Sequence, residues 1–338
     1  MRQWVVQDAF GLEHLALQEV ADPPPPGPGE ARVRMRAWSL NYRDLLMARG
    51  QYDPRLQLPY VPLSDGVGVV EAVGVGVERV AVGDRVCPTF CPTWLAGAPD
   101  ADAVRRTRGG PVPGVLAEVV QLDAAELVRV PARLTDAEAA SLPCAAVTAW
   151  NALVTVGRLQ PGQTALVIGS GGVSSAAVAI ARSCGARVVA VGRSPHKVAT
   201  LKGWGVEHWI SSVDEPRWGR AARQWSGGGV DVVVEVGGAG TLQQSLDAVR
   251  VAGTVAVIGN LAGAKEPLSV LPVLMKAVRC HGVYVGHRRS FEALCAALAA
   301  GTRPPAIGEA YAFEDAPAAF ATLASGEHAG KLCLTAAT

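Results

Sequence analysis

The sequence lacks a strong charge of either sign and any long apolar run. Its 338 residues carry 31 Lys+Arg and 30 Asp+Glu, a formal net charge of +1. So balanced a chain has no electrostatic footprint for nucleic acid or for an acidic membrane surface. No run is long and apolar enough to span a bilayer, and the first ten residues lack the apolar core of a signal peptide. We therefore expect a cytoplasmic protein that binds neither nucleic acid nor membrane.

Cysteines are few, and they do not form a regular pattern. The chain has seven, an odd number scattered along its length, which argues against a disulfide framework and favours a reducing compartment. Hydrophobic residues make up 49% of the chain, enough for sizeable cores. The length itself suggests two domains.

The most informative stretch is Gln163–Lys197, around which the rest of the chain is arranged. Thr164–Ile168 is β-branched and apolar, as buried strands are. A glycine-rich turn follows, then an alanine-rich helix over Val173–Cys184 and a second buried strand over Arg187–Val191. Strand, glycine turn, helix and strand in this order predict the first half of a dinucleotide-binding unit.

The turn suits a pyrophosphate for physical reasons. The dipole at a helix N-terminus favours negative charge, and backbone N–H groups there need partners. Gly171 and Gly172 have no Cβ to obstruct a close approach. We expect the turn and the first helical residue to bind the cofactor, through Gly169, Gly171, Gly172 and Val173. Ser174 stands where the usual pattern has a third glycine, and it is small enough for close helix–strand packing.

The end of the second strand lacks the acidic residue that holds a ribose hydroxyl in NAD-binding proteins. Gly192 leaves room, Arg193 offers a planar fork suited to phosphate, and Lys197 follows one helical turn later. Ser194 before Pro195 reads as a helix N-cap that adds N–H groups. This pattern predicts a 2′-phosphate pocket and hence NADPH. In the alternative interpretation, Arg193 and Lys197 are ordinary surface cations.

Apolar strands and helical stretches alternate beyond this unit. Three further strands are expected, separated by helices that include Leu242–Val251 and Val270–Arg279; the strands are Val230–Val236, Thr254–Ile258 and His281–Val285. Such alternation predicts an α/β fold with a doubly wound parallel sheet. The first 90 residues look all-β. We expect a β-rich domain over 1–129 and 287–338 and a dinucleotide-binding domain over 130–286.

Several motifs together resemble the medium-chain dehydrogenase/reductase superfamily. They are NYRDLL at Asn41–Leu46, PLSDGVGVVEAVG at Pro62–Gly74, VGDRV at Val82–Val86, SLPCAAVTAW at Ser141–Trp150, GSGGV at Gly169–Val173 and HAGKLCL at His328–Leu334. The resemblance implies a GroES-like catalytic domain, a Rossmann domain and a nicotinamide in the cleft between them. It also implies a homodimer joined through edge strands at His281–Val285.

The chain departs from the superfamily's zinc-dependent members at the metal. Those members carry Cys where Asn41 stands and a His-Glu pair where Ser64 and Asp65 stand, so that Cys144 alone matches a usual ligand. One thiol cannot hold catalytic Zn²⁺, which takes three protein ligands. A structural zinc site needs four cysteines, and Cys87 and Cys91 are the only two in that region. We predict no metal, and a packing role for Cys144.

The zinc-lacking, quinone oxidoreductase-like branch that the chain resembles implies hydride transfer to a small-molecule substrate. The acceptor is a quinone or the β-carbon of a conjugated carbonyl compound. Asn41 or Tyr42 would hydrogen-bond the substrate oxygen or the nicotinamide end, and Tyr42 or solvent would supply the proton. Simple wall packing is the alternative for Tyr42.

The resemblance also places residues from other segments near the cofactor. These are Thr148 and Lys331, and for Lys331 a solvated position is the alternative. Gly259 and Asn260 follow an expected sheet strand and therefore lie at its carboxyl edge, where ligands bind. Two other functions stay open: a zinc-free NAD(P)-dependent alcohol dehydrogenase or carbonyl reductase, and an NADPH-binding protein without turnover.

Overall fold

The computed structural model describes residues 1–337, whose contacts divide them into two compact units. Unit 1 consists of Met1–Val147, Gly286–Ala300 and the chain from Ile307 onward, and unit 2 consists of Thr148–Val285 and Gly301–Ala306. The expected domains placed 130–147 with the dinucleotide-binding part. These residues belong to unit 1 because the helix α3 (Asp136–Ala140) packs on strands of that unit.

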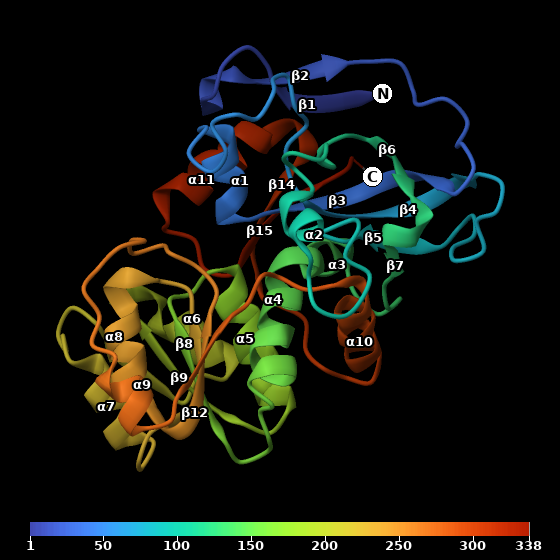
Figure 1. Ribbon diagram of the computed structural model, residues 1–338. Helices are drawn as coiled ribbons and strands as arrows, with labels where there is room; N and C mark the ends of the chain where they lie inside the picture. Colours follow the sequence, from blue (N-terminus) through green and yellow to red (C-terminus); the bar gives the residue numbers. More distant parts are fainter. Residues whose placement is uncertain (338) are drawn as a thin grey trace. The chain divides into compact units, whose positions relative to one another are not determined.

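Unit 1 is β-rich, as expected (Figure 1). Strands β1 (Arg2–Val6) and β2 (Leu15–Glu19) form an antiparallel pair. A seven-stranded sheet has the order β14 (Ile307–Ala312), β15 (Lys331–Thr335), β3 (Glu30–Leu40), β4 (Asp65–Val73), β5 (Arg85–Pro88) and β7 (Leu127–Arg129), with β6 (Val119–Asp123) paired to β3. Its other helices are α1 (Tyr42–Ala48), α2 (Ala101–Arg105), α10 (Arg288–Ala299) and α11 (Ala316–Ser325).

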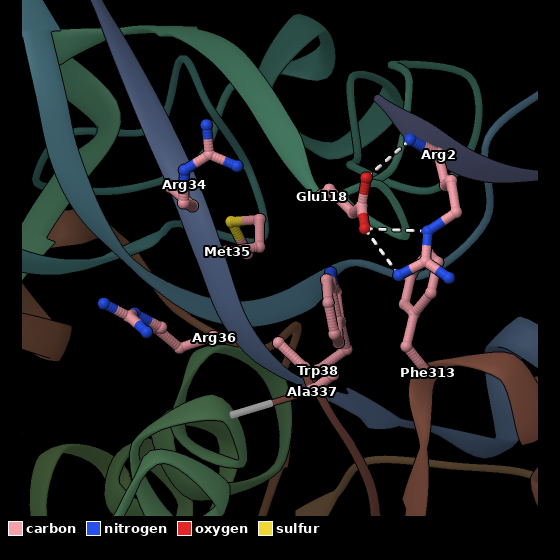
Figure 2. Close-up of a pocket in the computed structure, with 9 residues that line it drawn as sticks. Arg2, Arg34, Met35, Arg36, Trp38, Glu118, Phe313 and Ala337 are labelled. Carbon is pink, nitrogen blue, oxygen red and sulfur yellow. Dashed lines mark hydrogen bonds and ion pairs between the residues drawn. The ribbon is translucent and has the colours of Figure 1, made fainter. Parts of the chain in front are cut away.

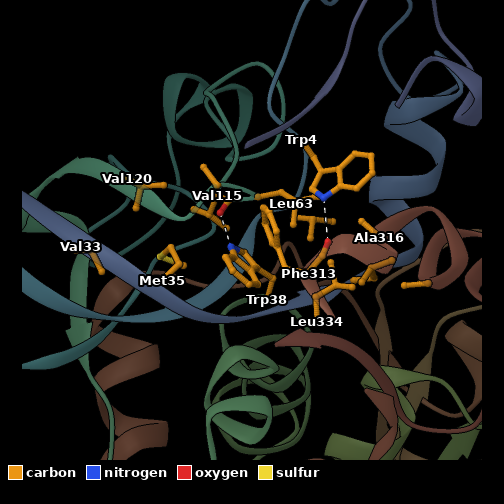
Figure 3. Close-up of a cluster of buried hydrophobic side chains, with 14 of the residues drawn as sticks. Trp4, Val33, Met35, Trp38, Leu63, Val115, Val120, Phe313, Ala316 and Leu334 are labelled. Atoms are coloured by element: carbon orange, nitrogen blue, oxygen red, sulfur yellow. Dashed lines mark hydrogen bonds between the residues drawn. The ribbon is translucent and has the colours of Figure 1, made fainter. Parts of the chain in front are cut away.

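Two buried tryptophans tie the core of unit 1 together (Figure 3). Trp38 is completely buried, packs on Phe313 with ring centroids 4.7 Å apart, and donates its indole N–H to the Val115 carbonyl at 2.5 Å. Trp4 donates its indole N–H to the Phe313 carbonyl at 2.9 Å. Both buried indoles therefore have a hydrogen-bond partner, as burial requires.

Unit 1 also contains a small cavity of about 140 Å³ (Figure 2). Arg2, Trp38 and Phe313 are among its lining residues. The charge of Arg2 is already matched, because its guanidinium contacts both Glu118 and Glu314 at 2.6 Å. None of the site residues expected from the sequence lines this cavity.

Unit 2 is built on a six-stranded parallel sheet. Its order is β10 (His208–Ser211), β9 (Arg187–Gly192), β8 (Thr164–Ile168), β11 (Val230–Glu235), β12 (Val249–Val257) and β13 (Arg279–Gly282). The first strand along the chain thus lies at the centre, and the order reverses between β8 and β11, as in doubly wound dinucleotide-binding folds. The helices are α5 (Gly172–Ser183), α6 (Val198–Trp204), α7 (Trp218–Trp225), α8 (Ala239–Ala248) and α9 (Leu271–Met275).

The predicted elements of unit 2 are confirmed in kind but not in all their limits. The helix expected to run to Val251 ends at Ala248, and β12 begins at Val249. The strand expected at His281–Val285 lies at Arg279–Gly282, and only Leu271–Met275 of the expected helix Val270–Arg279 is α-helical. Strand β10 was not predicted. No helix within residues 1–337 has the length and apolarity needed to cross a membrane.

Candidate functional site

A buried polar cluster in unit 1 brings together residues that the sequence analysis singled out separately. Asn41 is the N-cap of α1, Asp65 begins β4 with Ser64 just before it, and Lys331 begins β15. Cys144 lies in the π-helical segment Leu142–Ala146. The Ser64, Asp65 and Lys331 side chains are at most 2% exposed, so their polar groups must be satisfied within the protein.

Hydrogen bonds connect the cluster. The Lys331 amine donates to the Leu40 carbonyl at 2.7 Å and to Asn41 Oδ1 at 2.6 Å, and it lies 3.8 Å from Asp65 Oδ2. The other Asp65 oxygen, Oδ1, accepts the Ser64 hydroxyl at 2.6 Å, while the Cys144 backbone N–H donates to Oδ2 at 3.2 Å. The amide NH₂ group of Asn41 has a long contact of 3.4 Å to Ser64 Oγ.

The lysine determines the orientation of the Asn41 amide. A lysine amine here can only donate, so the oxygen of the amide faces Lys331 and its NH₂ group faces away. Burial raises the pKa of Asp65, and the Lys331 charge opposes that rise. The alternative that Lys331 is solvated is wrong, because its side chain is 2% exposed. Its contact with a cofactor stays a prediction.

Tyr42 and Asp44 have different environments although both lie in the first turn of α1. Tyr42 is 45% exposed within the described chain, so nearly half of its side chain is open. Asp44 is 1% exposed and accepts the Asn41 backbone N–H at 2.8 Å, which closes a capping box. This bond fixes the N-terminus of α1.

Asp44 is also an unusual acid. Burial raises its pKa to about 6, and the nearby Arg43 charge opposes the rise. Its second oxygen, Oδ1, is buried and has no hydrogen-bond partner within residues 1–337. Ionising this group therefore costs free energy that only the folded protein must supply.

Asp44→Asn should change how stability depends on pH. With a folded pKa of about 6 against 3.8 unfolded, native Asp44 holds its proton to higher pH, so its contribution is fully present below pH ~4. That contribution is lost as pH rises through ~6, and two pKa units correspond to about 3 kcal/mol. Asn keeps the acceptor for Asn41 and removes the titration. Urea unfolding at pH 4 and pH 7 measures this difference.

The control is Asp8→Asn, since Asp8 is an exposed carboxyl outside α1. It should follow the wild-type pH dependence of the free energy of unfolding. An Asp44→Asn variant that loses the same stability as wild type between pH 4 and pH 7 would contradict the assignment.

The donor set of the cluster does not fit Zn²⁺. The Asn41 oxygen is held by Lys331, and the Ser64 hydroxyl donates to Asp65. Burial and the adjacent Asp65 charge raise the pKa of the Cys144 thiol. Cys144 is the one thiol of this cluster, whereas catalytic Zn²⁺ takes three protein ligands. Within residues 1–337, no three His, Cys, Asp or Glu side chains are grouped to hold a metal ion.

Cys87 and Cys91 lie in the region where some family members have a structural zinc site, and they too are buried in the protein. Cys87 is completely buried, and its thiol lies 3.3 Å from the Ala139 carbonyl. Burial raises the pKa of Cys91 to about 12. Both side chains pack in the interior of unit 1 as thiols.

Unit 2 holds a second candidate site at the turn between β8 and α5. Gly169 has φ +76°, a conformation that favours glycine, and donates its N–H to the Val191 carbonyl at 2.7 Å. A Cβ at Gly169 or Gly171 would meet no atom within 4 Å, so the space beside the turn is open. Ser174 donates its hydroxyl to the Ile168 carbonyl at 2.7 Å, which ties helix to strand as the small residue predicted.

This turn fits the pyrophosphate of a dinucleotide. Helix α5 is twelve residues long and starts at Gly172, directly beside the open space, with Val173 next in its first turn. The turn lies where the strand order reverses, between β8 and β11, which is where such sheets bind ligands. When bound, a reduced nicotinamide dinucleotide supplies a hydride; the glycines would hold its phosphates.

The residues after β9 are arranged differently from the expectation. Arg193 is exposed and forms no ion pair within residues 1–337, whereas Lys197 is only 8% exposed. A 3₁₀ turn over Pro195–Lys197 separates them, with Ser194 as its N-cap through its carbonyl rather than its side chain. The surface-cation alternative is therefore wrong for Lys197, and Arg193 is the open cation at this edge.

The carboxyl ends of β11 and β12 contain a residue that the sequence analysis missed. Glu235 is completely buried, and its carboxylate accepts the N–H groups of Gly237 at 2.7 Å and Gly238 at 3.0 Å. It thereby shapes the turn before α8, against which Asn260 packs closely. The sequence signal that could have revealed this residue is an acid near the end of an apolar strand, two residues before a pair of glycines.

The other expected cofactor residues lie at defined places. Gly259 follows β12, and a Cβ there would lie 2.7 Å from the Val236 carbonyl oxygen, so glycine is needed for packing. Asn260 is exposed, and Thr148, in α4 (Val147–Trp150), is 2% exposed. Their contacts with a cofactor stay predictions.

Known proteins are similar to this chain over nearly its whole length. The family described as "Alcohol dehydrogenase GroES-like domain" matches residues 27–132, and "Zinc-binding dehydrogenase" matches residues 172–300. A zinc-type alcohol dehydrogenase-like protein of Schizosaccharomyces pombe is 36% identical over 98% of both chains.

Solved structures agree with this likeness. A putative alcohol dehydrogenase from Sinorhizobium meliloti has a TM-score of 0.92 at 38% identity, covering 99% of this chain and 98% of its own. A 2-octenoyl-CoA carboxylase reductase, solved with NADP and 2-octenoyl-CoA, has a TM-score of 0.86 at 26% identity, covering 96% of this chain and 82% of its own.

Proposed function

Because this chain belongs to the medium-chain dehydrogenase/reductase superfamily, we propose that it is a zinc-independent, NADPH-dependent reductase of quinones or of the activated C=C bond of α,β-unsaturated carbonyl compounds. That it is an NAD(P)H-dependent oxidoreductase follows from its relatives. One observation carries the finer proposal: Asn41 and Asp65, which stand where the family's zinc-dependent members have metal ligands, both contact the buried amine of Lys331.

The cluster can orient a substrate oxygen without a metal. The Lys331 amine polarises the Asn41 amide through its oxygen, which strengthens the amide NH₂ group as a donor. Asn41 and the exposed Tyr42 hydroxyl would donate to a carbonyl oxygen that gains negative charge. A conjugated acceptor spreads that charge itself, so two neutral donors suffice. Tyr42 or solvent would then supply the proton.

An alcohol substrate would need more from the site. Its hydroxyl has to lose a proton, and a Lewis acid normally lowers that pKa. The donor set described above supplies hydrogen bonds but no three metal ligands. The second candidate function is a zinc-free alcohol dehydrogenase or carbonyl reductase, because similar proteins carry the name alcohol dehydrogenase.

A panel of acceptors tests this function. We expect oxidation of NADPH with quinones and enones, followed by nicotinamide absorbance, and no loss of rate after treatment with a chelator. Asn41→Asp should lower kcat/KM by about 100-fold, the usual effect of removing one oxyanion donor. Turnover of saturated aldehydes or alcohols alone would support the second candidate instead. NADPH binding without any turnover would indicate a non-catalytic protein.

Arg193→Asp tests the choice of nucleotide. The exposed Arg193 would form charge-assisted hydrogen bonds with a 2′-phosphate, and losing its guanidinium should weaken NADPH binding about 10- to 100-fold. NADH, which lacks that phosphate, should bind as before. Fluorescence titration with each nucleotide measures both constants. Lys202→Glu, at an exposed position of α6, is the matched control and should keep the preference. Equal losses for the two nucleotides would refute the 2′-phosphate assignment.

We also propose that the sheet edge of unit 2 joins two copies of the chain. All four residues of β13 are exposed, and the strand pairs on one side only, with β12. Exposed apolar side chains lie nearby in the sequence, on α9 and just before it: Val270, Leu271, Leu274 and Met275. An uncovered edge strand with an apolar neighbourhood favours association, and a second copy presents a matching edge.

Sedimentation velocity at micromolar concentration should therefore show a dimer. Leu274→Lys combined with Met275→Lys should yield monomers, because two charges would have to be buried in the interface. Val82→Lys, at an exposed apolar position of unit 1, should stay dimeric. A wild-type protein that sediments only as a monomer would remove this proposal.

A further inference from the structure

The ring of Trp209 covers the backbone of Gly192. A Cβ built on Gly192 would lie 2.3 Å from Trp209 Cη2 and 2.9 Å from Cζ3, well inside contact distance. The two residues lie on neighbouring parallel strands: Trp209 is opposite Ala190, and Gly192 is two residues further along β9. Alternate residues of a strand share one face of the sheet, so the indole reaches along that face to the end of β9.

Glycine at 192 is required by this ring and not by the backbone. Gly192 is absent from the residues with positive φ, so other residues could adopt its conformation. Nothing else within 4 Å is nearer than the indole. The sequence interpretation, that Gly192 leaves room for a phosphate, is thus replaced by a different reason for glycine: it leaves room for Trp209.

The position matters because of what lies beside it. The Gly169 N–H is bonded to the Val191 carbonyl, so the open glycine-rich turn adjoins this end of β9. A ribose-binding carboxylate in an NAD-type site projects from about this point, roughly 20 residues after the turn. Here the Trp209 ring occupies the space in which such a side chain would begin, so the side chain would have to displace the indole, while Arg193 next to it is exposed.

We propose that Trp209 restricts cofactor choice at the end of β9: its indole occupies the space that an acidic side chain at position 192 would need, which leaves Arg193 as the residue that selects a 2′-phosphorylated nucleotide. The proposal rests on the NADPH preference proposed above. It predicts that cofactor preference cannot be changed at Gly192 alone, because the space that a new carboxylate needs is filled from the next strand.

Four proteins test it: wild type, Gly192→Asp, Trp209→Ala and the double variant, each titrated with NADPH and NADH. Gly192→Asp alone should gain no NADH affinity. Trp209→Ala alone should keep the preference for NADPH, because Arg193 is unchanged. The double variant should shift the NADH-to-NADPH affinity ratio at least about tenfold beyond the product of the single effects, a coupling expected only of residues in contact.

A second set of variants measures the steric contact by melting temperature, without any nucleotide: Gly192→Ala in wild type and in Trp209→Ala. This set still tests the contact if Gly192→Asp does not fold. Gly192→Ala should lower the melting temperature when Trp209 is present and lower it much less in Trp209→Ala. Additive melting effects, or a Gly192→Asp variant that binds NADH as well as the double variant does, would overturn the proposal. A wild type indifferent to the 2′-phosphate would instead refute the proposed NADPH preference, and the melting cycle would still report whether the ring excludes side chains.

Discussion

The polar contacts of the buried Lys331 amine are the interactions on which the candidate site of unit 1 depends. Burying a lysine is unfavourable unless its hydrogens find acceptors, and here they meet the Leu40 carbonyl, Asn41 and the Asp65 carboxylate. Strand register brings these groups together, because Leu332 lies opposite Leu40 while Ser39 lies opposite Asp65. A shift of one residue in either pairing would turn Asp65 or Lys331 to the other face of the sheet.

This arrangement connects the fold to the proposed chemistry. A metal ion with an open coordination position could polarise an alcohol oxygen, whereas the Lys331 amine can only donate hydrogen bonds. It can therefore hold an amide in one orientation but cannot accept electrons from an alcohol oxygen. A site of this kind works best on acceptors that stabilise their own developing charge. The proposed preference for quinones and enones follows from that limit.

Features that depend on residues close together in the sequence could be predicted, whereas features that depend on residues far apart in the sequence could not. Thr164–Ile168 was predicted to the residue, because its apolar pattern and the glycine-rich turn after it are local signals. Lys331 was open between two alternatives, because its partner Asn41 is 290 residues away in the chain. The strand β10 was not predicted, because its four residues are too few to show a clear pattern of apolar and polar residues.

Glycine shows most clearly where local reasoning ends. Gly171 and Gly192 were both assigned to the cofactor because each lacks a Cβ near the expected phosphates. The space beside Gly171 is open, so its missing Cβ is available to a ligand. The space beside Gly192 is filled by the protein's own indole, so its missing Cβ serves packing. The two residues are both glycine and differ in what occupies the space where a Cβ would be. For Gly192 that space is occupied by Trp209 of the neighbouring strand. What position 192 can hold therefore depends on two neighbouring strands together, and the sequence around Gly192 alone does not record it.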